Sequence, residues 1–195
     1  MFKNVAFFAS YNDARKTPAD PRPQIAFAGR SNVGKSSLLN KLSGRHKLAK
    51  TSKIPGRTRR IDFFLVDERF YLVDLPGYGY VKAGVEARKK WGQLVENYLR
   101  NVDNLKGLVF LLDCRRDPND DDMQMLEWLK ANDVNFIIAL TKADKLGRGA
   151  LCQKNTAIRK LLGVETIPVS SISGVGKNEL IKWIDTTVKN QTERS

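Results

Sequence analysis

The chain has 195 residues, of which 42% are hydrophobic and 28% charged, a composition that excludes a disordered or membrane-embedded protein. No stretch approaches the roughly 18 consecutive apolar residues of a membrane span, and the N-terminus lacks a signal-peptide pattern, so we expect a cytoplasmic protein with no membrane partner. The formal net charge of +13 indicates attraction to polyanions such as nucleic acid, with a merely solvated basic surface as the alternative.

Short apolar runs alternate with amphipathic stretches, a pattern typical of an α/β fold whose mostly parallel sheet has helices on both faces. An arm at 1–23, rich in proline near its end, is expected to be partly extended and mobile. Six strands are predicted, at 24–28, 61–66, 70–74, 108–113, 136–140 and 166–169. Helices are predicted at 35–43, 88–101, 121–132, 151–162 and 177–190. One domain therefore spans 24–190, followed by a tail at 191–195.

The sequence also predicts the structure of two connecting segments. The turn between strands 61–66 and 70–74 is too short for a crossover, so these strands are predicted to form an antiparallel hairpin at a sheet edge. The acidic run Asn119 to Asp122 precedes a predicted helix. It is more typical of a helix cap than of a cation site.

The segment GRSNVGKS at 29–36 fits the GxxxxGK[ST] pattern and lies between a strand and a helix, as a phosphate-binding loop must. Its glycines let the backbone wrap closely, so that successive amide N–H groups hold phosphate oxygens. Lys35 is predicted to reach the β- and γ-phosphates, and the Ser36 hydroxyl to ligate Mg²⁺. The predicted nucleotide-binding residues here are Gly29, Arg30, Ser31, Asn32, Val33, Gly34, Lys35, Ser36 and Ser37.

A second motif, DLPG, closes the strand 70–74. The Asp74 carboxylate is predicted to lie near Mg²⁺ and to hold it indirectly, while the Gly77 amide meets the γ-phosphate and senses its presence. Alone this motif could be an ordinary strand-ending turn, but the phosphate-binding loop upstream favours a nucleotide site. Its predicted nucleotide-binding residues are Asp74, Leu75, Pro76 and Gly77.

The segment TKAD follows the predicted strand 136–140. The Asp144 carboxylate can accept hydrogen bonds from N1–H and the 2-amino group of guanine, a donor pair that adenine lacks. Lys142 is predicted to lay its alkyl stem along the base, and many GTPases have Asn where this chain has Thr141. The predicted base-binding residues are Thr141, Lys142, Ala143 and Asp144, joined by Ser170, Ser171 and Ile172 after the last strand.

The first switch must fall between the helix 35–43 and the strand 61–66. Thr58 is the favoured Mg²⁺ ligand in this segment, and Thr51 competes for that role. The predicted nucleotide-binding residues are Gly56, Arg57, Thr58, Arg59 and Arg60. The catalytic candidates of the whole site are Lys35, Thr58 and Gly77.

Together GRSNVGKSSLLN, TSKIPGRTRRIDFF, DLPGYGY and TKAD resemble the EngB family of bacterial GTP-binding proteins, in the TrmE-Era-EngA-EngB-Septin-like GTPase class. The resemblance covers about 24–184. It implies a Ras-like P-loop NTPase fold and slow intrinsic GTP hydrolysis. It also implies a role in assembly of the large ribosomal subunit and a requirement for normal cell division and septation.

Tyr78 follows the glycine of DLPG, where Ras-type enzymes carry the glutamine that orients the attacking water. Hydrolysis by the isolated protein should therefore be poor, and another group, a bound cation or a partner must complete the site. Asn32 matches the asparagine that ligates K⁺ in some GTPases lacking the glutamine, so K⁺ is a possible cofactor beside Mg²⁺. Tyr78 and Tyr80, close to several basic residues, form a candidate partner-binding surface.

The leading hypothesis is a switch in which GTP and Mg²⁺ order the loops 45–60 and 78–90 into a basic surface for ribosomal RNA of the large-subunit precursor. The alternative is a regulator that binds a cell-division protein without direct contact to ribosomal RNA. A P-loop ATPase or kinase conflicts with Asp144. We expect a monomer that exchanges GTP and GDP.

Overall fold

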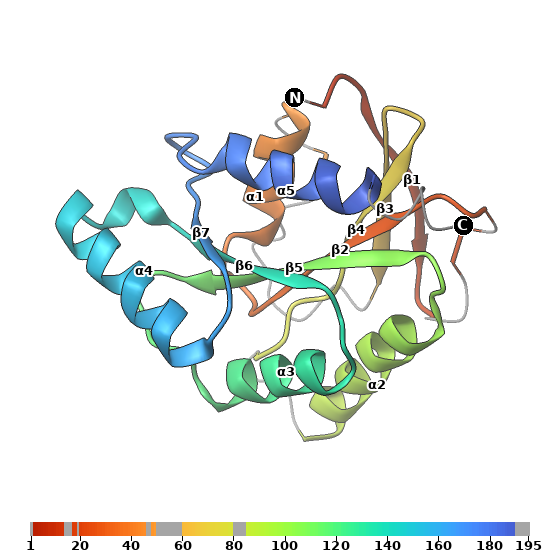
Figure 1. Ribbon diagram of the computed structural model, residues 1–195. Helices are drawn as coiled ribbons and strands as arrows, with labels where there is room; N and C mark the ends of the chain where they lie inside the picture. Colours follow the sequence, from red (N-terminus) through yellow and green to blue (C-terminus); the bar gives the residue numbers. More distant parts are fainter. Residues whose placement is uncertain are drawn as a thin grey trace.

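The computed structural model describes residues 2–13, 17–18, 20–45, 48–49, 60–79 and 85–189, with the side chains of the last range described from residue 92 onward. Figure 1 shows the order of the elements along the chain. They are β1 (Val5–Tyr11), β2 (Gln24–Gly29), α1 (Lys35–Ser43), β3 (Ile61–Val66), β4 (Phe70–Asp74), α2 (Val85–Asn101), β5 (Leu105–Asp113), α3 (Asp120–Ala131), β6 (Phe136–Thr141), the 3₁₀ turn η1 (Ala143–Lys145), α4 (Arg148–Leu162), β7 (Thr166–Pro168) and α5 (Lys177–Lys189).

The strands form one sheet in the order β1-β3-β4-β2-β5-β6-β7. Neighbours from β4 to β7 pair in parallel, whereas β1 with β3 and β3 with β4 are antiparallel. Helices α2, α3 and α4 cover one face, and α1 and α5 cover the other (Figure 1). The predicted mostly parallel α/β sheet with helices on both faces is confirmed.

Among the described residues the sheet has seven strands and not the predicted six. The extra strand, β1, comes from the segment expected to be an arm, and it runs antiparallel to β3 from Val5 opposite Val66 to Tyr11 opposite Ile61. Burial does not alternate along its sequence, VAFFASY, and the pairing register shifts between Phe7 and Ala9, as at a β-bulge. The β3–β4 hairpin is present as predicted, but β1 and not β3 forms the sheet edge.

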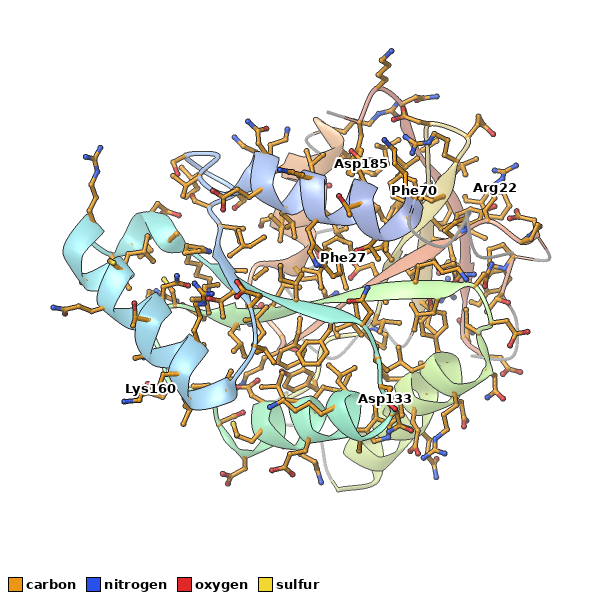
Figure 2. The ribbon with its side chains drawn as sticks, viewed as in Figure 1. Arg22, Phe27, Phe70, Asp133, Lys160 and Asp185 are labelled. Atoms are coloured by element: carbon orange, nitrogen blue, oxygen red, sulfur yellow. The ribbon has the colours of Figure 1, made fainter. Side chains whose placement is uncertain are left out.

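Two hydrophobic clusters, one on each face, hold the layers together. The central strand β2 is buried along its whole length, as expected of a parallel strand covered on both faces. Phe27 of β2 lies between the sheet and α5 (Figure 2). Because β2, β4, β5 and β6 are parallel and buried, their carboxyl ends are fixed at one edge of the sheet.

The contribution of β1 to stability can be measured with a matched pair of variants. Val5 is 1% exposed and packs in the cluster on the α1 and α5 side, whereas the adjacent Ala6 is exposed. Val5→Ser should lower the free energy of unfolding by about 2 kcal/mol, because apolar burial is lost and a hydroxyl is buried. Ala6→Ser should change it by less than about 0.5 kcal/mol. Equal urea midpoints for both variants would contradict the pairing of β1.

Candidate nucleotide-binding site

Three loops meet at the carboxyl edge of the sheet, after β2, β4 and β6. Ligands of open α/β sheets bind at this edge, outside the ends of the strands. The three predicted motifs, at 29–36, 74–77 and 141–144, lie on these loops. The fold therefore brings together segments that are far apart in the sequence.

The loop after β2 has the backbone conformation of a phosphate cradle. Asn32 and Gly34 are left-handed, with φ of 65° and 108°. Gly34 caps α1 without a side-chain hydrogen bond, and the first turn of α1 has no acidic residue. The N–H groups at this helix start are thus available to an anion. A Cβ on Gly29 would come within 3.0 Å of Leu111 on β5, so the close approach of the two strands requires glycine there.

Lys35 and Asp74 form an ion pair at the start of α1 and the end of β4. Their side chains are only 11% and 13% exposed. Burial raises the pKa of the Asp74 carboxyl, and the nearby Lys35 ammonium acts against that increase. The two groups that the sequence assigns to phosphate and Mg²⁺ are therefore direct neighbours.

The loop after β4 lies against the phosphate cradle. The Ser31 amide donates to the Tyr78 carbonyl at 2.8 Å, and the Ser31 hydroxyl donates to the Gly77 carbonyl at 3.3 Å. A Cβ on Gly77 would stand 3.1 Å from the Ser31 nitrogen, so a side chain here would force the two loops apart. This contact fixes Gly77 beside the cradle.

Tyr78 is a core residue, so its predicted place on a partner-binding surface is wrong. Its side chain is 5% exposed, and its ring stacks on Phe110 with an interplanar angle of 8°. Its hydroxyl donates to Asp122 at the start of α3. Burial, with the negative charge of Asp122 beside it, raises the pKa of the Tyr78 hydroxyl far above its usual value. Tyr80 lies outside the described residues.

Asp122 also belongs to the helix cap that the acidic run predicts. The Asn119 side chain accepts from the Asp122 amide, and the Asp122 side chain accepts from the Asn119 amide, both at 3.0 Å. The prediction of a cap is confirmed. What the sequence did not indicate is that the same carboxylate holds Tyr78 and so ties α3 to the loop after β4.

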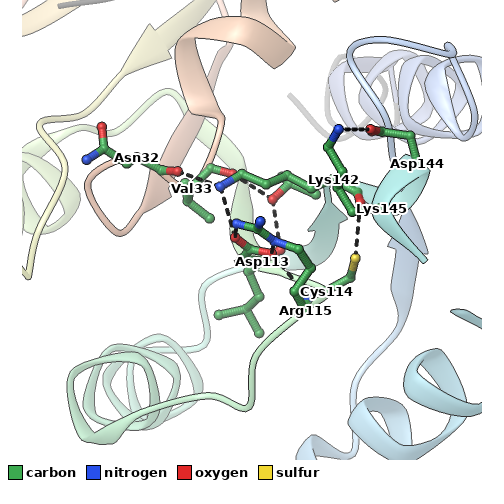
Figure 3. Close-up of polar contacts among 10 residues, drawn as sticks. Asn32, Val33, Asp113, Cys114, Arg115, Lys142, Asp144 and Lys145 are labelled. Carbon is green, nitrogen blue, oxygen red and sulfur yellow. Dashed lines mark hydrogen bonds and ion pairs between the residues drawn. The ribbon is translucent and has the colours of Figure 1, made fainter. Parts of the chain in front are cut away.

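Two side chains of the TKAD motif bind the phosphate cradle. The Thr141 hydroxyl lies 2.6 Å from the Val33 carbonyl oxygen and 3.1 Å from that of Leu112, and its single proton favours the nearer. The Lys142 ammonium donates to the Asn32 carbonyl oxygen at 2.9 Å (Figure 3). Thr141 thus joins the TKAD motif to the cradle, in the position where many GTPases have asparagine.

Asp113, at the end of β5, is a residue that sequence reasoning missed. Its carboxylate accepts from Lys142 at 2.9 Å and from two nitrogens of Arg115 at 2.9 and 2.7 Å (Figure 3). Burial acts to raise the pKa of Asp113, but these hydrogen bonds outweigh it and hold the pKa well below its usual range. The feature of the sequence that could have identified Asp113 is its position as the last residue of a buried parallel strand.

Asp144 and the loop after β7 form a second coupled pair. The Ser170 hydroxyl, 1% exposed as a residue, donates to Asp144 at 2.6 Å and accepts from the amides of Ile172 and Ser173 at 3.2 and 3.0 Å. The hydrogen bond from Ser170 lowers the pKa of Asp144. The predicted base-binding segments 141–144 and 170–172 therefore do lie together, although the second had little support in the sequence.

Thr141→Val tests the link between the guanine motif and the cradle. Valine has nearly the same shape but leaves the buried Val33 carbonyl without its hydroxyl donor, which should cost about 1–3 kcal/mol in unfolding free energy. Thr156→Val, at an exposed position on α4, is the matched control and should be nearly neutral. Urea unfolding compares the two. A Thr141→Val protein as stable as the control would contradict the assigned role.

Several predicted residues cannot be placed. The first-switch candidates Gly56, Arg57, Thr58 and Arg59, and the competitor Thr51, lie outside the described residues. Arg60 is exposed just before β3. Within the described ranges, no three His, Cys, Asp or Glu side chains gather as a metal-binding group, and no helix is long and apolar enough to cross a membrane.

A strand–cradle–helix loop, joined at one sheet edge to an Asp74 motif and a TKxD motif, defines a P-loop GTPase. Solved structures show the same fold. A crystal structure of a probable GTP-binding protein EngB has a TM-score of 0.72 at 24% identity and covers 86% of this chain and 100% of that one. Era, crystallised with MgGDPNP and nucleotides 1506–1542 of 16S ribosomal RNA, has a TM-score of 0.64 at 25% identity and covers 83% and 55%.

Sequence comparison defines the family. A family model described as 50S ribosome-binding GTPase matches residues 24–142. The probable GTP-binding protein EngB of Clostridium kluyveri is 45% identical over 95% of this chain and 96% of its own length, and that of Halothermothrix orenii is 45% identical over 93% and 94%. The chain belongs to the EngB family of GTP-binding proteins.

Proposed function

We propose that this chain binds GTP and GDP with Mg²⁺, hydrolyses GTP slowly, and acts as a nucleotide-dependent switch in assembly of the large ribosomal subunit. The observation that carries the proposal is the convergence of Lys35, Asp74 and Asp144 on one edge of the sheet, with Thr141 and Lys142 bonded to the cradle. The family description and the net charge of +13 support the ribosomal partner. The same proposal includes a cytoplasmic monomer needed for normal cell division and septation.

Nucleotide binding follows from the hydrogen-bond donors and acceptors at the carboxyl edge of the sheet. The cradle amides and the start of α1 receive the phosphates, and Lys35 leaves its partner Asp74 to neutralise the β- and γ-phosphates. Asp144, oriented by Ser170, accepts from guanine. The Ser36 hydroxyl and the Asp74 carboxylate are hard oxygen donors and fit Mg²⁺, which would supply positive charge to the phosphates.

Slow hydrolysis follows from the position of Tyr78. Its side chain is held beneath α3 by Phe110 and Asp122, so it offers no group to orient a water at the γ-phosphate. Another group must supply that function. We propose that K⁺ at Asn32 or a partner protein supplies it.

The K⁺ proposal has a direct test. GTP hydrolysis should be several-fold faster in KCl than in NaCl at equal ionic strength, and Asn32→Gly should abolish the difference. Glycine is the appropriate replacement because residue 32 has a φ of 65°, which glycine adopts without strain. Equal rates in the two salts for the unaltered protein would remove K⁺ from the proposal.

The ribosomal role predicts nucleotide-dependent binding. In a pelleting assay with large-subunit precursors, the protein bound to a GTP analogue should sediment with the particles more than the GDP form. Binding should weaken steeply with salt, since it depends on contacts to phosphate. Equal sedimentation with GTP analogue, GDP and no nucleotide would reject the switch. A salt-insensitive complex with a division protein would favour the alternative regulator.

A further inference from the structure

A cavity of about 540 Å³ lies beside the phosphate cradle, between residues 30–33 and the loop after β5. It borders the proposed nucleotide site: residues 30–33 and Lys142 line the cavity, whereas Lys35, Ser36, Asp74 and Asp144 do not. Its charged lining residues are Arg30, Asp113, Arg115, Arg116, Asp117, Asp122 and Lys142. Three carboxylates and four cations thus line the same cavity. The ion pairs among them determine which charged groups are free to bind a ligand.

Each carboxylate already has a partner. Asp113 pairs with Arg115 and Lys142, and Figure 3 shows this cluster. Asp117 pairs with Lys154 at 2.6 Å. Asp122 is buried and accepts from the Tyr78 hydroxyl and the Asn119 amide. Cations therefore compensate the charges of Asp113 and Asp117, whereas the partners of Asp122 are neutral, so one negative charge stands against the remaining cations.

Two guanidinium groups remain. Among the described residues, neither Arg30 nor Arg116 has a side-chain hydrogen bond or ion pair, although the charge of Arg30 acts to lower the pKa of the Tyr78 hydroxyl. They come from different segments, Arg30 from the cradle and Arg116 from the turn after β5. Unpaired arginines that face one cavity favour an anion, and the planar guanidinium fork matches phosphate oxygens best.

We propose that this cavity binds a backbone phosphate of ribosomal RNA through Arg30 and Arg116. This inference rests on the proposed ribosomal partner and assigns it a contact through Arg30 and Arg116, two residues that lie outside the loops 45–60 and 78–90. The net charge of +13 would draw RNA to the protein, and the cavity is large enough to admit a phosphate with part of its sugar.

The site is also next to the second switch. The stem and Nε of Arg30 cover Gly79, since a Cβ built on Gly79 would lie 2.9 Å from that nitrogen. Gly79 has a φ of 70° and directly follows the buried Tyr78. A phosphate that draws the Arg30 guanidinium toward the cavity uncovers Gly79. RNA contact is in this way linked to the segment whose position depends on the nucleotide.

The experiment compares Arg116→Gln with Arg148→Gln, which removes the same charge from an exposed position on α4. Binding to fragmented large-subunit ribosomal RNA is measured by fluorescence anisotropy over a series of salt concentrations. For Arg116→Gln the magnitude of the slope of log affinity against log salt should decrease by about 1, because one phosphate contact is lost. The affinity for GDP should be unchanged. Arg148→Gln should keep the full slope.

A second measurement follows the chemical accessibility of the Arg30 and Arg116 side chains directly. Phenylglyoxal labels free guanidinium groups, and mass spectrometry reports the labelling of each arginine in the unaltered protein. RNA fragments should protect Arg30 and Arg116 several-fold but not Arg148, and inorganic phosphate at the same phosphate concentration should protect none. Equal protection by inorganic phosphate would assign the cavity to free phosphate and overturn the RNA contact.

The outcomes separate the two proposals. An unaltered protein that fails to bind ribosomal RNA would overturn the proposed partner and, with it, this contact. Full RNA binding with an unchanged slope in Arg116→Gln, and no protection of Arg30, would overturn this contact alone.

Discussion

Asp144→Asn should lower the affinity for GTP by about a thousandfold and make XTP the preferred nucleotide. The Asp144 carboxylate has two acceptor oxygens for the N1–H and 2-amino donors of guanine, whereas the asparagine amide has one acceptor and one donor group. Xanthine has a carbonyl where guanine has the amino group, so the new N–H₂ donor matches it. Leaving a donor unpaired at a site built for hydrogen bonding carries a penalty of this size.

The measurement is the equilibrium affinity of fluorescent GTP, GDP, ATP and XTP with Mg²⁺. Asp133→Asn is the matched control, because it makes the same charge change at an exposed position in the loop before β6 (Figure 2). Its φ of 50° is one that asparagine tolerates well. Unchanged GTP affinity in Asp144→Asn would show that guanine is read elsewhere, and equal binding of ATP and GTP by the unaltered protein would reopen the kinase hypothesis.

Tyr78→Gln should not accelerate GTP hydrolysis, although it restores the residue that Ras-type enzymes use. Position 78 places its side chain in the core between Phe110 and Asp122, and not at the γ-phosphate. Glutamine there loses the ring stacking and buries an amide. The free energy of unfolding should fall by about 3 kcal/mol.

Tyr78→Phe separates the contribution of the ring stacking to stability from that of the hydroxyl. It keeps the ring against Phe110 and removes only the hydroxyl that donates to Asp122, so its loss should be about 1–3 kcal/mol. Urea unfolding gives the stabilities, and single-turnover hydrolysis with the protein in saturating excess over GTP gives the rates. Faster hydrolysis by Tyr78→Gln than by the unaltered protein would show that residue 78 reaches the nucleotide, contrary to its burial.

The candidate site was predictable where motif and chain position agree. The cradle, Asp74 and Asp144 each follow a buried strand, and parallel strands place such residues at one edge of the sheet. Asp113 satisfies the same rule but matches no motif, so its role as the partner of Lys142 and Arg115 emerged only from the contacts. Ser170 was a weak prediction because its function depends on the position of Asp144.

Sequence alone determined the α/β fold, the parallel core strands and the nucleotide motifs, because these depend on local periodicity and on residue types at short spacing. Tertiary structure decided three matters: β1 as the seventh strand, Tyr78 as a core residue, and the lack of an ion pair for Arg30 and Arg116 among the described residues. Each depends on partners distant in sequence, since β1 needs the open edge of β3 and Tyr78 needs Asp122 on α3. The amino-acid sequence alone does not show which charged side chains will form ion pairs or which strand edges will pair with another strand.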